Sequence, residues 1–117
     1  IFTSIGCATC HTPVWTTGPN PSPALSEKRF QAYSDFLLHD LGPDLADICA
    51  PGAGRSEWRT TPLMGLSLRS VFLHNGRAQR LVDAVELHGG EAAGSRALFR
   101  SLSENMRQDL VRFLQSL

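Results

Sequence analysis

The sequence lacks an excess of charge of either sign, and it lacks any long apolar run. Its 117 residues carry 11 basic and 11 acidic side chains, and like charges are not clustered. This balance gives no support to binding of nucleic acid or of an anionic membrane surface, because both favour basic patches. No stretch of 18 apolar residues occurs, so the sequence predicts no membrane-spanning helix.

Alternating apolar and polar residues are also scarce, and there is no internal repeat or low-complexity tract. Alternation is the main sequence signal for half-buried strands, so its scarcity disfavours sheets. The 10 glycines and 7 prolines favour long loops. Together with the chain length, these features predict one small all-α domain over residues 1–117, with short helices, long loops and a modest core.

The most informative feature that is present is the motif Cys7-Ala8-Thr9-Cys10-His11. C-x-x-C-H is the attachment signature of c-type haem. The two thiols can form thioethers with the vinyl groups of one porphyrin, and the imidazole can bind the iron from one side. A disulfide, or a pair of zinc ligands, is the alternative reading of the cysteines. We therefore expect a cytochrome c-like domain wrapped around one covalent haem c.

The clearest helical patterns lie in the last third of the chain. Residues 79–88 place Leu81, Val85 and His88 on one helical face. Residues 91–101 indicate a second helix. Ser103 is a predicted N-cap for a third, whose apolar stripe is Met106, Leu110, Phe113, Leu114 and Leu117.

The first two thirds give weaker signals. Residues 1–11 resemble the end of a helix that runs into the haem motif. We expect loops over residues 12–26 and 44–60, because both are rich in breakers. Residues 27–41 are apolar without one clean period, which fits either a short helix or extended chain.

The second axial ligand of the iron would set its chemistry, and four side chains compete for this position: Met64, His88, His74 and His39. Met64 and His88 have the strongest arguments. Met64 lies 54 residues beyond Cys10, in an apolar loop flanked by proline and glycine. His88 shares a helical face with apolar residues, where an unpaired imidazole would cost about 1–3 kcal/mol to bury. Iron coordination would remove that cost. The alternative for Met64 is a core filler. The alternatives for His88 are a core histidine bonded to a backbone carbonyl and a histidine at a helix C-terminus favoured by the dipole.

Two further histidines, a third cysteine and several arginines also bear on the site. We expect His74, before the turn-forming pair Asn75-Gly76, to act as a structural hydrogen-bonding group. We expect His39 to pair with Asp40 or with a haem propionate. Cys49 is expected to be buried or unpaired. The candidate partners of the haem propionates are Arg55, Arg59, Arg69 and Arg77, since a guanidinium matches a carboxylate in bidentate geometry.

Several sequence blocks, spread over nearly the whole chain, form a specific set: Phe2-x-x-Ile5-Gly6-Cys7-x-x-Cys10-His11, Tyr33 to Asp47, Glu57 to Leu66, Phe72 to Arg77, and Ala84-Val85-x-x-His88-Gly89-Gly90-Glu91-Ala92. This set resembles the C-terminal haem domain of bacterial di-haem oxidoreductases. That group is often labelled thiol-oxidoreductase-like and is related to the di-haem cytochrome c peroxidases.

The resemblance implies a ligand set. In the peroxidase relatives the distal ligand of this haem, often methionine, comes from the position that His88 occupies here. The implied iron ligands are therefore His11 and His88, with Met64 as the alternative to His88. Leu63 and Met64 would then be apolar neighbours of the ring.

The resemblance also frames the function. The relatives carry two haem motifs and perform peroxide chemistry at the other haem, whereas this sequence contains one C-x-x-C-H. We therefore expect single-electron transfer to a redox partner protein or a neighbouring haem domain, without catalytic residues. A component of a di-haem peroxidase is the first alternative, and a haem-based ligand sensor is the second.

Haem c is attached outside the cytoplasm, so we expect a periplasmic or otherwise extracytoplasmic protein that has lost an export signal. Only six residues precede Cys7, where a whole helix is usual. We expect the sequence to be the C-terminal part of a longer polypeptide.

Overall fold

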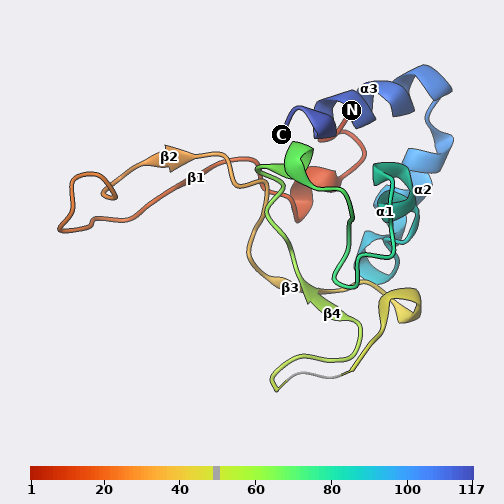
Figure 1. The fold of residues 1–117 in the computed structure, drawn as a ribbon, viewed down its shortest axis with the longest axis horizontal. Helices are drawn as coiled ribbons and strands as arrows, with labels where there is room; N and C mark the ends of the chain where they lie inside the picture. The colour runs from red at the N-terminus through yellow and green to blue at the C-terminus, as the bar shows by residue number, and fades with distance from the viewer. Residues whose placement is uncertain (49–50) are drawn as a thin grey trace.

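The computed structural model describes residues 1–48 and 51–117 as a body with one long projecting arm (Figure 1). The helices are α1 (Leu81–Glu86), α2 (Ala93–Ser101) and α3 (Glu104–Gln115), with the 3-10 turns η1 (Cys7–Thr9), η2 (Pro43–Leu45), η3 (Leu66–Leu68) and η4 (Gly90–Ala92). The strands are β1 (Trp15–Thr16), β2 (Arg29–Phe30), β3 (Leu38–Asp40) and β4 (Glu57–Arg59).

The prediction of an all-α fold is wrong. The structure is 34% helical and 11% strand, and it contains two antiparallel sheets of two strands each, β1–β2 in the arm and β3–β4 in the body. Each strand is only two or three residues long. Such strands are too short to show an alternating pattern, and backbone hydrogen bonds between loops hold them together. Sequence periodicity therefore could not reveal them.

The helical prediction for the last third is largely confirmed. Ser103 caps α3, where its side chain accepts a hydrogen bond from the Met106 amide at 3.4 Å. Leu110 and Leu114 of the predicted stripe are buried, but Met106 is 40% exposed. Helix α1 is shorter than predicted and ends at Glu86. No described helix is long and apolar enough to cross a bilayer.

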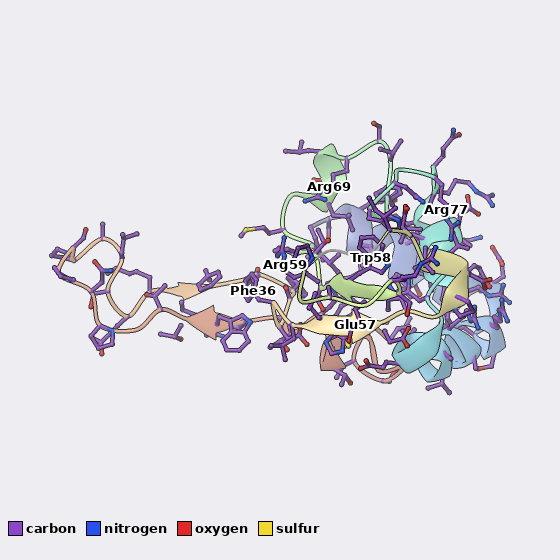
Figure 2. All side chains as sticks on the ribbon, turned by 90° about the horizontal axis from the view of Figure 1, so that it is seen from below. Phe36, Glu57, Trp58, Arg59, Arg69 and Arg77 are labelled. Carbon is purple, nitrogen blue, oxygen red and sulfur yellow. The ribbon has the colours of Figure 1, made fainter. Side chains whose placement is uncertain are left out.

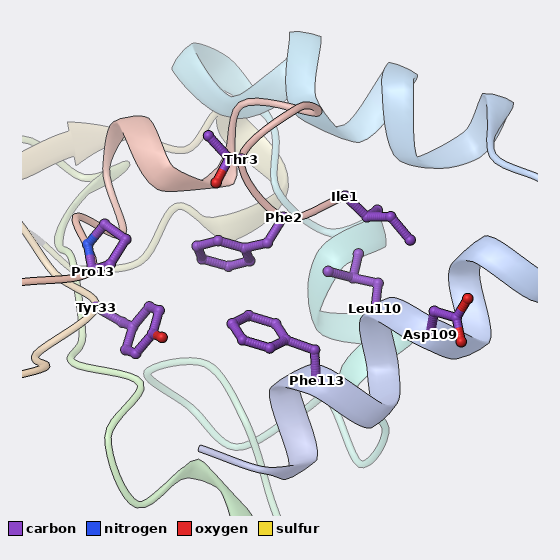
Figure 3. Close-up of a pocket in the computed structure, with 8 residues that line it drawn as sticks. All are labelled: Ile1, Phe2, Thr3, Pro13, Tyr33, Asp109, Leu110 and Phe113. Carbon is purple, nitrogen blue, oxygen red and sulfur yellow. The ribbon is translucent and has the colours of Figure 1, made fainter.

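The N-terminal segment is held against α3 by aromatic side chains. Residues 1–11 form turns and the short η1 rather than the end of a helix. Phe2, Tyr33 and Phe113 face one another beside an open cavity of about 380 Å³ (Figure 3), with ring centroids 5.3–5.9 Å apart. Aromatic pairs at this spacing contribute beyond their buried area. This cluster fixes Tyr33 next to the segment that carries the haem motif.

Gly89 and Gly90 do more than end a helix. The Gly89 amide donates to the Leu41 carbonyl at 3.1 Å. Gly90 has φ +49°, and a Cβ there would collide with the Asp40 carbonyl oxygen. Only glycine allows this approach, which packs the chain after α1 against the end of β3. His88 is thereby brought to the same region as the β3–β4 sheet.

Candidate haem site

The structure contains a cavity of about 650 Å³ between the N-terminal segment, the β3–β4 sheet, the loop over residues 60–74 and the helices. This volume is in the range of cofactor sites. Its walls are mostly apolar, as cofactor sites usually are, and include Leu41, Leu45, Leu63, Leu66, Phe72, Leu81, Val85, Leu110 and Leu114. The cavity is the place where the sequence-predicted site residues meet.

The C-x-x-C-H motif lies on this cavity. Cys7 begins η1, and both Cys7 and Cys10 line the wall. Within the described part of the chain both are free thiols. Burial raises the pKa of each thiol, Cys7 and Cys10 alike, so both are protonated at neutral pH. Cys49, expected to be buried or unpaired, lies outside the described residues.

His11 is held in one orientation by a backbone carbonyl. Its Nδ1 lies 3.0 Å from the carbonyl oxygen of Tyr33, a residue in the left-handed region with φ +51°. Burial lowers the pKa of His11, so the ring is neutral. Because a carbonyl can only accept, Nδ1 carries the proton and Nε2 keeps its lone pair. This is the arrangement found for metal-ligating histidines.

His88 is held in the same way as His11, by a hydrogen bond to a backbone carbonyl of α1. It follows α1, and its Nδ1 lies 2.7 Å from the carbonyl oxygen of Ala84. Burial lowers the pKa of His88 as well. The sequence-based alternatives for this residue were a carbonyl-bonded core histidine and an iron ligand. The structure shows the carbonyl bond, and that bond leaves Nε2 free for the second role.

The spacing of the two rings fits a metal ion between them. Both rings line the cavity, and their centroids are 6.5 Å apart with an interplanar angle of 46°. A metal–imidazole bond of about 2.0 Å, plus about 1.2 Å from the ring nitrogen to the ring centre, gives about 6.4 Å for two ligands on opposite sides. The residues present therefore fit an iron ligated by His11 and His88.

His39 has no nitrogen left for a metal. Its Nδ1 lies 2.8 Å from a Glu91 carboxylate oxygen, and its Nε2 lies 2.7 Å from Asp35. The hydrogen bond to Glu91, and next that to Asp35, raises the pKa of His39. Its partner is thus not Asp40, the neighbour named in the sequence-based expectation. Cys10 and Asp35 lie near His39 at metal-ligand spacing, but the imidazole there is already bonded on both sides.

His74 has the structural role expected for it. Its Nε2 lies 3.2 Å from an Asp47 carboxylate oxygen. Its ring stacks on Trp58 with centroids 3.6 Å apart and planes 8° from parallel. Trp58 in turn donates from Nε1 to the Leu45 carbonyl at 3.0 Å. These contacts tie the loop over residues 60–74 to β4 and η2.

Leu63 and Met64 separate in the structure. Leu63 lines the cavity. Met64 is 49% exposed and is not among the described residues that line it. The loop therefore brings Leu63, rather than Met64, to the cavity wall.

The four arginine candidates also differ in whether they line the cavity. Arg59 and Arg69 line the cavity, whereas Arg55 and Arg77 donate to the backbone carbonyls of Asp47 and Asp44. Sequence reasoning missed Arg96, which lines the cavity and donates to the Glu86 carbonyl at 3.3 Å. The available signal was its spacing from other wall residues, since Ala92, Ser95 and Arg96 follow an i, i+3, i+4 pattern.

Comparison with known proteins gives one finding. A family model described as "Di-haem oxidoreductase, putative peroxidase" matches residues 1–117. No curated protein and no solved structure matches the chain. The family match agrees with the resemblance carried by the sequence blocks, and the family name implies haem binding. The chain therefore belongs to the di-haem oxidoreductase family.

Proposed function

We propose that this domain binds one haem c through Cys7 and Cys10, holds its iron between His11 and His88, and transfers single electrons. The observation that carries the proposal is the pair of imidazoles across the cavity, 6.5 Å between centroids. Each uses Nδ1 on a carbonyl and keeps Nε2 free. That combination is typical of axial ligands.

The chain's own residues would position the haem and set its potential. Two imidazoles favour a lower potential than an imidazole with a thioether, and burial in an apolar cavity tunes the value. The haem supplies one-electron chemistry. Ala84 and Tyr33 hold the ligand rings through their carbonyls, so little rearrangement is needed when the charge of the site changes.

The family supports a partner for the electron. Its members are described as di-haem proteins, while the 117 residues contain one C-x-x-C-H motif. We infer that the electron passes to or from a neighbouring haem domain or a redox partner protein. Because haem c is attached outside the cytoplasm, we place the protein in the periplasm or another extracytoplasmic compartment.

The test is spectroscopy of protein produced with a haem c maturation system. A pyridine haemochrome should report one haem per chain, and acidified acetone should fail to extract it. The absorption spectrum should be low-spin and unchanged by cyanide or carbon monoxide. Cys7→Ser with Cys10→Ser should abolish covalent attachment. A colourless matured protein, or colour that acidified acetone removes, would overturn the proposal.

A second candidate function is a component of a di-haem peroxidase, which the family description favours. It requires a position on the iron that peroxide can reach. A high-spin spectrum, rapid ligand binding and turnover of hydrogen peroxide would select this candidate. Rapid binding of carbon monoxide without peroxide turnover would select a ligand sensor instead.

A further inference from the structure

The arginines of the described chain fall into two groups, those with partners and those without. Seven are bonded to a carboxylate or a backbone carbonyl: Arg55, Arg77, Arg80, Arg96, Arg100, Arg107 and Arg112. Within residues 1–48 and 51–117, no hydrogen bond or ion pair involves the guanidinium of Arg29, Arg59 or Arg69. Arg29 is in β2 of the arm. Arg59 and Arg69 both line the cavity.

Arg59 and Arg69 lie at the two ends of one segment of the cavity wall. Arg59 is the last residue of β4, and Arg69 follows η3. The chain between them contributes Leu63 and Leu66 to the wall. Both arginines are exposed on their outer side, so they stand where the cavity meets solvent. Figure 2 shows them on the part of the body nearer the arm, with Arg77 farther away.

We infer that Arg59 and Arg69 form the binding site for the two haem propionates. The inference rests on the proposed function, because it presumes that a haem fills this cavity. A haem has apolar edges and one edge with two carboxylates. The cavity has mostly apolar walls and two exposed guanidinium groups that have no partner among the described residues. Guanidinium and carboxylate pair in bidentate geometry. The propionate edge would therefore lie at the part of the cavity wall that carries Arg59, at the end of β4, and Arg69, after η3.

The other basic side chains that line the cavity have hydrogen-bond partners. Arg96 donates to the Glu86 carbonyl and lies on α2, beside His88. His39 is held between two carboxylates, which would repel a propionate. His74 is bonded to Asp47. Among the described residues, Arg59 and Arg69 are thus the arginines on the cavity wall whose guanidinium groups have no partner.

The test is the pH dependence of the reduction potential in matured protein. The potential falls as pH rises through the pKa of a propionate, because the new negative charge favours the oxidised iron. A cation within about 4–6 Å lowers a carboxyl pKa by about 1–3 units. The double variant Arg59→Gln/Arg69→Gln should therefore move this fall to higher pH by about one unit or more. The matched control Arg29→Gln should leave the profile unchanged.

Single variants and charge-preserving variants sharpen the result. Each single Gln variant should move to higher pH the part of the potential–pH curve that belongs to one propionate. The Arg59→Lys/Arg69→Lys variant should move the curve less than the Gln pair does. The other titrating groups around the cavity are His39, Asp35, Glu91, His74 and Asp47. They are present in every variant, so the difference between profiles isolates the propionates.

The failure of this inference can be distinguished from failure of the proposed function. A matured protein with a low-spin haem whose profile is the same in wild type and in both double variants would overturn the propionate site alone. If the Gln pair does not mature, the single variants and the Lys pair give the same comparison. A protein without covalent haem would overturn the proposed function itself.

Discussion

The four histidines of this domain form two pairs that differ in the atoms bonded to them. His11 and His88 each place Nδ1 on a backbone carbonyl. His39 and His74 each bond to carboxylates instead. All four line the same cavity, so the two pairs of histidines do not differ in lying on this cavity. They differ in the group that each ring is hydrogen-bonded to.

The difference shows how one residue type can serve two purposes in one site. A carbonyl accepts a hydrogen bond but carries no net charge, so burial dominates and lowers the pKa of His11 and of His88. Two carboxylates favour the protonated ring and raise the pKa of His39. A neutral ring with a free Nε2 can bind a metal ion, whereas a ring between two carboxylates favours the protonated form.

The largest expected effect comes from removing one member of each pair. His88→Ala should convert the low-spin spectrum of the matured protein to a high-spin one, because the iron loses its second imidazole. His39→Ala should leave the protein low-spin, since neither His39 nitrogen is available to the iron. Absorption spectra of the two variants, before and after addition of imidazole, check this prediction.

Met64 supplies the control for that experiment. Met64→Leu should retain the low-spin spectrum and show no change in near-infrared bands. A near-infrared band of iron–sulfur ligation in the wild type, lost in Met64→Leu, would assign the second ligand to Met64 and contradict the bis-histidine site.

A second prediction concerns Gly90, whose close contact with Asp40 brings the segment after α1 against β3. Gly90→Ala places a Cβ against the Asp40 carbonyl at a left-handed φ. We expect a loss of about 2 kcal/mol or more in the free energy of unfolding. The same change should weaken the Glu91 contacts to His39 and to the Asp40 amide. Urea unfolding checks it, with Gly94→Ala as the control because its Cβ meets open space.

A third prediction tests how His11 is held. Phe113 packs on Phe2 and Tyr33, and the Tyr33 carbonyl accepts from His11. Phe113→Ala should cost about 2–3 kcal/mol, below the range for a fully buried phenylalanine because Phe113 is partly exposed. In the matured protein it should also broaden the haem absorption bands, because the His11 ring is held less firmly. Phe113→Leu should recover only part of the stability, because it restores apolar volume but not the ring contacts with Phe2 and Tyr33. Full recovery in Phe113→Leu would contradict an aromatic role.

The comparison also shows what the sequence could predict. The C-x-x-C-H motif predicts haem attachment by residue type and spacing. The predicted cap of α3 and part of its predicted apolar stripe hold in the structure, although Met106 is exposed. These are local features. His88 was identified as a candidate because of its helical face and a family resemblance, although α1 ends before it.

What the sequence could not predict depends on contacts between distant segments. The pairing of His39 with Glu91 spans 52 positions, and that of β3 with β4 rests on backbone hydrogen bonds. The carbonyls of Tyr33 and Ala84 leave no trace in residue type, because every residue has one. The fold class was wrong for the same reason. Two sheets formed by loop segments carry no periodic pattern.

The smallest predicted effect isolates the His39 cation. Its folded-state pKa is raised above the ordinary value of 6.5, so the stabilisation is fully present below that value. It is lost as pH rises through the folded-state pKa. Wild type should therefore lose stability relative to His39→Gln as pH rises from about 6 through the raised folded-state pKa of His39.

Urea unfolding followed by far-UV circular dichroism, at steps across this range, measures that difference. His11 and His88 have lowered pKa values, so their linkage acts at lower pH, and it is common to both proteins. A difference that stays constant with pH would mean that His39 contributes packing alone. A difference that declines through the window would show that the carboxylates hold this ring as a cation, in contrast to the neutral pair it faces across the same cavity.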